Sequence, residues 1–231
     1  MIIDPLYLIL LVPGFALALW AQWKVRSAYA KAQKSPALVS GADAARRMLD
    51  RVGLHDVGIE MTHGFLSNHY DPRHKVLRLS PEVHKSRTLA AVGIAAHEAG
   101  HAVQDARAYA PLVVRSAALP LAAFGGNTAI LVFIGGLLFG GLATLVGSWM
   151  LLAGIALFSG VVFFQLVNLP VEFNASSRAK AALGELAIVG SPQQAAVVNR
   201  VLGAAAMTYV AATISAILTL VYMLFRAGLL G

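Results

Sequence analysis

Long stretches without charge alternate with polar segments along the chain. Three stretches contain no Asp, Glu, Lys or Arg, namely residues 6–23, 116–171 and 201–225. Because a transmembrane helix needs about 20 apolar residues, the first and last stretches each suit one crossing, and the middle stretch suits two. A Gly-rich turn near Gly140 and Gly141 would separate the two middle helices. The four predicted helices are residues 6–23, 119–139, 144–167 and 201–225.

Polar segments fill the intervals between these helices. The pattern predicts a mainly α membrane protein with about four transmembrane helices. Its predicted parts are a first transmembrane helix in 1–23, a polar region at 24–118, a transmembrane hairpin at 119–167, a polar segment at 168–200 and a fourth transmembrane helix at 201–226.

The first apolar stretch has a second interpretation, a cleaved signal peptide. Signal peptides begin with a basic segment, but no Lys or Arg precedes this stretch. Trp20, Trp23 and Lys24 follow it, which is typical of an anchor at the lipid–water interface. We therefore predict a retained transmembrane helix.

The polar region carries the signals of a small α+β unit. Apolar residues recur at helical spacing in 41–52, and Gly53 closes this helix. Ser80, Pro81 and Glu82 together form a helix-start signal. The other predicted elements are strands at 57–61 and 75–79, a turn at 70–73 between these extended segments that makes a short β-hairpin, and a helix at 87–107.

Composition and charge support a membrane location. The chain is 58% hydrophobic and 13% charged, whereas soluble domains carry roughly 25% charged residues. The net charge is +7 without a dense basic block, so we expect no nucleic-acid partner. The two polar segments hold 17 of the 18 Lys and Arg residues, and four crossings place them on one side. The positive-inside rule predicts that this side is the cytoplasmic face of the plasma or inner membrane.

Residues 97–101 read His-Glu-Ala-Gly-His, which is the H-E-x-x-H pattern. On a helix, His97 and His101 lie one turn apart on one face, so their imidazoles can bind one Zn²⁺ ion. Glu98 is then predicted to be the general base. A surface helix could carry this pattern by chance, but the apolar residues 89–96 predict a partly buried helix whose polar groups need partners. The chain has no cysteine, which excludes thiolate ligands and Cys nucleophiles.

A zinc peptidase needs a third protein ligand and one open position for water. The chain has no His after His101 and no Asp after Asp105, so Glu172 and Glu185 are the downstream candidates. Glu172 is favoured because it follows the predicted hairpin, which returns the chain to the polar side. Pairing with Arg178 is an alternative role for Glu172. Five histidines are expected to be surface residues rather than ligands: His55, His63, His69, His74 and His84.

Several segments make the chain resemble the YugP-type membrane zinc metallopeptidases. They are residues 66–73, 76–80, 95–104, 169–176 and 204–210, and the resemblance extends over most of the chain. The chain is more distantly similar to HtpX-type peptidases, where a transmembrane hairpin also separates H-E-x-x-H from a ligand glutamate in a Glu-Phe-x-Ala stretch. The resemblance implies that His97, His101 and Glu172 are the zinc ligands and that Glu98 is the base.

One position departs from the distant relatives. They often carry an acid four residues after the ligand glutamate, which bonds a zinc-binding histidine. Here that position is Ser176. The residues that could replace the acid are Asn174, Asp71 and Asp105.

We therefore predict a membrane zinc endopeptidase with a zincin-like catalytic region and one Zn²⁺ ion. Its substrates would be membrane-associated or misfolded proteins or peptides. A donor for the oxyanion is also required, and Tyr209 is our choice among five candidates, the others being His69, Tyr70, Arg178 and Arg200. Residues 76–79 are either an edge strand that binds peptide through its backbone or an ordinary hairpin strand.

Two other functions compete with this prediction. A site-2-type intramembrane protease places H-E-x-x-H within a span and uses an intramembrane Asp, but the chain has no Asp after Asp105. The other is a zinc-binding membrane scaffold without catalysis, which the sequence does not distinguish from an enzyme, because ligands and a base do not by themselves prove turnover.

Overall fold

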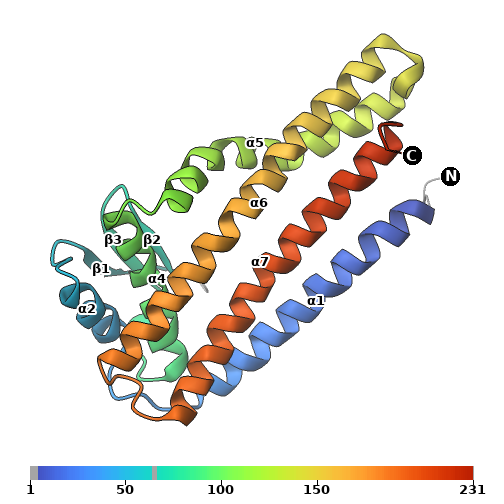
Figure 1. Cartoon of the computed structure of the whole chain (residues 1–231). Coiled ribbons are helices and arrows are strands. Elements are labelled where there is room, and N and C mark those ends of the chain that lie inside the picture. The colour runs from blue at the N-terminus through green and yellow to red at the C-terminus, as the bar shows by residue number, and fades with distance from the viewer. Residues whose placement is uncertain (1–4, 64–66, 231) are drawn as a thin grey trace. The chain divides into compact units, whose positions relative to one another are not determined.

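The computed structural model describes residues 5–63 and 67–230 (Figure 1). The first four residues of the predicted helix at 1–23, and Leu66 at the start of the segment at 66–73, lie outside the described residues. The chain divides into two compact units. The apolar unit comprises residues 5–20, Val114–Leu169 and 209–230, and the polar unit comprises Ala21–Val113 and Pro170–Thr208.

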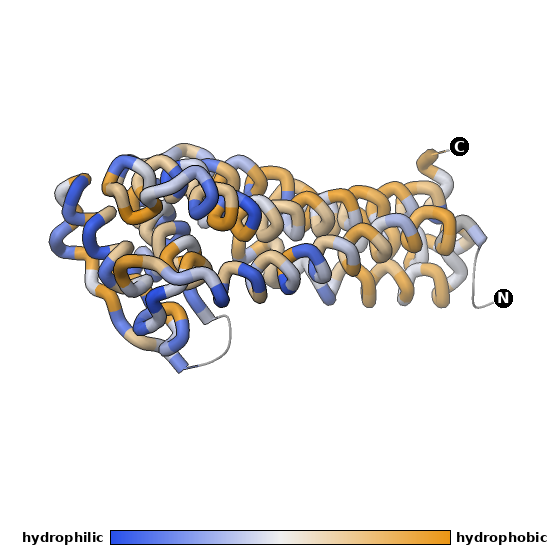
Figure 2. The backbone as a smooth tube through the Cα atoms, turned by 90° about the horizontal axis from the view of Figure 1, so that it is seen from below, coloured by the Kyte–Doolittle hydropathy of each residue, from blue (hydrophilic) through white to orange (hydrophobic). Residues whose placement is uncertain are grey.

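Four helices in the described part of the chain are long and apolar enough to cross a membrane. They are α1 (Pro5–Gln33), α5 (Ala110–Leu138), α6 (Leu145–Glu185) and α7 (Pro192–Arg226). Figure 2 shows their hydrophobic residues concentrated along the parts that belong to the apolar unit. The predicted number of candidate spans is therefore confirmed among the described residues.

These helices extend beyond the predicted spans. The predicted polar segment at 168–200 begins inside α6, which continues to Glu185 with Pro170 in its interior. The sequence pattern located the end of the uncharged stretch. The helix α6 continues beyond that point, because its later side chains pack in the core of the polar unit. Residues 170–185 of α6 thus become part of the polar unit.

Two glycines shape the hairpin of α5 and α6. Gly140 has a φ of 95°, a left-handed conformation that favours glycine, and it precedes a short 3₁₀ turn, η1 (Gly141–Ala143). This turn lies where the sequence predicted it. At Gly136, a Cβ atom would lie only 2.8 Å from the backbone nitrogen of Leu151. The absence of a side chain there lets the two helices approach closely, as small residues do in membrane bundles.

The polar unit contains the remaining elements. They are α2 (Gly41–Arg51), β1 (Gly58–Met61), β2 (His69–Asp71), β3 (Val76–Leu79), α3 (Pro81–Lys85) and α4 (Leu89–Ala106). Hydroxyl caps begin three of the helices, with Ser40 before α2, Ser80 before α3 and Thr88 before α4. The core includes the buried Leu49 and Leu77.

The described strands form a three-stranded sheet in the order β1-β3-β2. β2 is antiparallel to β3, with His69 opposite Arg78, and β1 is parallel to β3, with Gly58 opposite Val76. The predicted β-hairpin therefore exists, but it joins β2 and β3 instead of the segments at 57–61 and 75–79.

One further prediction about the sheet was wrong, and one pair of alternatives is decided. The turn predicted at 70–73 begins later, because Asp71 still belongs to β2 and its Oδ1 accepts hydrogen bonds from the backbone N–H groups of Arg73 and His74. Residues 76–79 were either an edge strand or an ordinary hairpin strand, and the second alternative is correct, because β3 pairs antiparallel with β2 and lies between β1 and β2. A peptide cannot add to it, and the edge strands are β1 and β2.

Candidate metal centre

The two histidines of the H-E-x-x-H pattern lie one turn apart on α4. Their rings meet edge to face with centroids 4.7 Å apart, and their Nε2 atoms are 3.2 Å apart. The side chains of His97 and His101 are only 15% and 12% exposed. Both Nε2 atoms thus point toward one shared position in a partly buried site.

Glu172 reaches the same position from α6. Its Oε2 lies 3.2 Å from Nε2 of His97 and 3.7 Å from Nε2 of His101, and its side chain is 4% exposed. Ligands about 2.0–2.1 Å from a tetrahedral zinc ion would lie about 3.3 Å from one another. Two imidazole nitrogens and one carboxylate oxygen at these separations fit a zinc ion. The structure thus brings the three predicted ligands together, and zinc binding by them stays a prediction.

Gly100 lets the two ligand-bearing helices meet. A Cβ atom at this position would lie 2.7 Å from the carbonyl oxygen of Ala175 on α6. Ala175 is fully buried and sits three residues after Glu172. The glycine inside the H-E-x-x-H pattern therefore has a packing role that the zinc pattern alone does not reveal.

The competing roles for the downstream acids can now be compared. Glu185 forms an ion pair with Arg51 at 2.8 Å, and its side chain is 57% exposed. Arg178 donates to Asn174 at 2.7 Å. These contacts favour Glu172 as the third ligand over Glu185, and they give Arg178 a partner other than Glu172.

Neutral groups contact the outer nitrogens of both histidines. Nδ1 of His97 lies 3.1 Å from Oγ of Ser176, and Nδ1 of His101 lies 3.0 Å from Oε1 of Gln104. Ser176 is the position where distant relatives often have an acid. Gln104 was not identified from the sequence, and the available signal was an amide three residues after a predicted ligand on one helix.

Asp105 and Asp71 were proposed to replace the acid that distant relatives carry at position 176, but both form hydrogen bonds with other groups. Asp105 accepts a hydrogen bond from the hydroxyl of Tyr70 at 2.9 Å, and Asp71 lies within 3 Å of both His74 and Arg78. Of the three candidates, Asn174 is the one connected to the site, through a 3.0 Å hydrogen bond from Gln104.

The surroundings of the site raise the pKa of both Glu98 and His101, for different reasons. Burial raises the pKa of Glu98, against the opposing effect of the nearby His97 and His101. Burial lowers the pKa of His101, but its hydrogen bond with Glu172 and the charge of Glu98 outweigh burial, so the pKa of His101 is raised overall. A carboxylate with a raised pKa is a stronger proton acceptor, as a general base requires.

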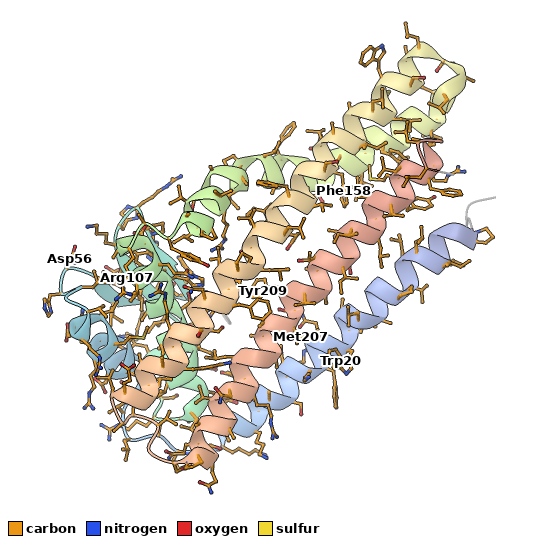
Figure 3. All side chains as sticks on the ribbon, in the orientation of Figure 1. Trp20, Asp56, Arg107, Phe158, Met207 and Tyr209 are labelled. Carbon is orange, nitrogen blue, oxygen red and sulfur yellow. The ribbon has the colours of Figure 1, made fainter. Side chains whose placement is uncertain are left out.

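The candidate oxyanion donors have different surroundings. The hydroxyl of Tyr70 donates a hydrogen bond to Asp105, and Nδ1 of His69 lies 2.8 Å from the carbonyl oxygen of Ser67. Arg200 is exposed on α7. Tyr209, labelled in Figure 3, is the first residue of α7 that belongs to the apolar unit, and its catalytic role stays a prediction.

Fold and donor set together define a class of protein, a mainly helical protein with four candidate membrane spans and a partly buried His-His-Glu group beside a glutamate. The family described as "Putative neutral zinc metallopeptidase" matches residues 7–228, and the chain belongs to this family. The chain is 43% identical over 227 residues to "Putative membrane protease YugP" of Bacillus subtilis (strain 168), covering 96% of this chain and 98% of that protein. No solved structure matches the chain. The predicted family membership is thus confirmed, and it supports a zinc protease associated with a membrane.

Proposed function

We propose that this protein is a membrane-embedded zinc endopeptidase that hydrolyses peptide bonds in membrane-associated or misfolded proteins. The observation that carries the proposal is the meeting of His97, His101 and Glu172 within 4.8 Å of one another, with Glu98 next to His97 on the same helix. The family and the similar membrane protease support the same chemistry.

Each side chain has a defined role in this reaction. His97, His101 and Glu172 would hold one Zn²⁺ ion. Zinc bound there would act as a Lewis acid on the scissile carbonyl and make water a better nucleophile. Glu98 takes a proton from the attacking water on its carboxylate and then delivers it to the leaving amine nitrogen. The phenol of Tyr209 is proposed to stabilise the oxyanion by donating a hydrogen bond.

The two polar segments support a cytoplasmic location of this chemistry, since they hold 17 of the 18 basic residues. A site-2-type protease is less well supported. Such an enzyme carries H-E-x-x-H within a span, but α4 is not among the candidate spans in the described chain.

The general base is tested by Glu98→Gln in the full-length purified protein. The amide cannot accept the proton, so hydrolysis of casein should fall by about 100- to 10,000-fold. The zinc content should stay unchanged because Glu98 is not a ligand. Glu82→Gln, on the exposed surface of α3, is the matched control.

Two results would contradict the proposal. Casein hydrolysis by Glu98→Gln at the wild-type rate would remove Glu98 from the reaction. Absence of chelator-sensitive hydrolysis by the wild-type protein would favour a zinc-binding scaffold.

A further inference from the structure

An unbroken chain of hydrogen bonds runs from Arg178 to the imidazole of His101. Nε of Arg178 donates to Oδ1 of Asn174 at 2.7 Å, and Nε2 of Gln104 donates to the same oxygen at 3.0 Å. Gln104 also donates to the carbonyl oxygen of Val171 at 2.8 Å, and its Oε1 lies 3.0 Å from Nδ1 of His101. Gln104 is fully buried, so these contacts replace the hydrogen bonds that its amide would make with water.

Only one arrangement of donors and acceptors satisfies this series of hydrogen bonds. A guanidinium group has donors and no acceptor, so Asn174 must turn its carbonyl oxygen toward Arg178. That oxygen and the Val171 carbonyl can only accept, so the amide nitrogen of Gln104 faces them. The amide oxygen of Gln104 then faces His101, and the hydrogen between them must be on Nδ1 of the imidazole.

A hydrogen on Nδ1 leaves a lone pair on Nε2 of neutral His101. Nε2 is the atom that lies 3.2 Å from Nε2 of His97 and 3.7 Å from Oε2 of Glu172. We infer that Arg178, Asn174 and Gln104 form a positioning relay that holds His101 in its metal-binding tautomer. This inference rests on the proposed function, because it requires His101 to bind zinc.

The relay explains why the outer partner of His101 is an amide. Outer partners of zinc-binding histidines are often carboxylates. A carboxylate at position 104 would face two acceptors, the Val171 carbonyl and Asn174 Oδ1, without a hydrogen to donate to them. The amide of Gln104 donates from its nitrogen to these two acceptors and accepts a hydrogen bond from His101 on its oxygen. Gln104 also links the two ligand helices, since Val171 directly precedes Glu172.

Asn174 is the link best suited to a test, because it is only partly buried and its bonds go to Gln104 and Arg178. Asn174→Asp keeps an oxygen acceptor for both donors, whereas Asn174→Leu removes it. The zinc dissociation constant of each full-length variant is measured by competition with a chromophoric chelator. We expect Asn174→Leu to weaken zinc binding about tenfold, and Asn174→Asp to bind zinc as tightly as the wild type or more tightly.

The control is Asn199→Leu, an exposed position on α7 in the polar unit, which should leave zinc affinity unchanged. Gln104→Met provides a second measurement and should weaken binding by about 10- to 100-fold. Adding Arg178→Met to Gln104→Met should then change little, because the relay is already broken.

The possible failures are distinguishable. If Asn174→Leu binds zinc like the wild type, or if both Asn174 variants lose affinity equally, the relay is wrong and the three ligands stand. Additive losses from Gln104→Met and Arg178→Met would also overturn the relay. If the wild-type protein itself binds no zinc, the proposed function fails, and the relay fails with it.

Discussion

Gly100 allows a close approach between the two helices that carry the proposed metal ligands. Its missing side chain leaves room for the carbonyl oxygen of Ala175, which would be 2.7 Å from a Cβ atom. Overpacking of this kind costs about 1–3 kcal/mol. At the scale of single residues, we therefore expect the distance between the proposed ligands on α4 and α6 to depend on Gly100, which is not itself a proposed ligand.

Gly100→Ala is therefore expected to push α4 away from α6. Zinc content and casein hydrolysis should both fall, and the unfolding temperature in detergent should decrease. The matched control is Gly184→Ala, where a Cβ atom has no neighbour within 4 Å and alanine should stabilise the exposed helix slightly. Full zinc occupancy in Gly100→Ala would show that the helices do not need this approach.

The sequence predicted the proposed ligands but not all of their partners. His97, Glu98 and His101 could be predicted because their spacing is a local property of one helix. Glu172 could be favoured because few downstream acids exist. Gln104 was missed, since its position three residues after His101 is a weak signal and its importance comes from contacts with residues on α6 that are about 70 positions away.

Close packing between α5 and α6 is the main feature at the scale of secondary-structure elements. A Cβ atom at Gly136 would lie 2.8 Å from the backbone nitrogen of Leu151. Gly136→Ala should separate the helices of the hairpin and lower the unfolding temperature in detergent, whereas Gly126→Ala has open space and should not. Equal unfolding temperatures for the two variants would contradict this view of the hairpin.

Element types were easier to predict than their pairing. The turn at Gly140 and the cap at Ser80 follow from local chemistry, so the sequence indicates them directly. The order β1-β3-β2 depends on a parallel pairing between segments that are not adjacent in sequence. Helix ends were also missed, because α6 continues past the apolar stretch into the core of the polar unit.

Orientation in the membrane is a property of the whole molecule. The chain contains no cysteine, so single introduced cysteines can report its orientation without further changes. We expect Glu60→Cys, exposed in the polar unit, to react with a membrane-impermeant maleimide only after the cells are opened. Leu142→Cys, exposed in the turn between α5 and α6, should react in intact cells. The reverse pattern would place the proposed catalytic region outside the cytoplasm.

Zinc analysis of Glu172→Ala is the most direct test of the whole account, because this carboxylate on α6 is the proposed third ligand beside the two histidines of α4. The wild-type protein and Glu185→Ala should each contain one zinc ion per chain, whereas Glu172→Ala should lose most of its zinc. Undiminished zinc in Glu172→Ala, or loss of zinc in Glu185→Ala, would contradict the proposed site.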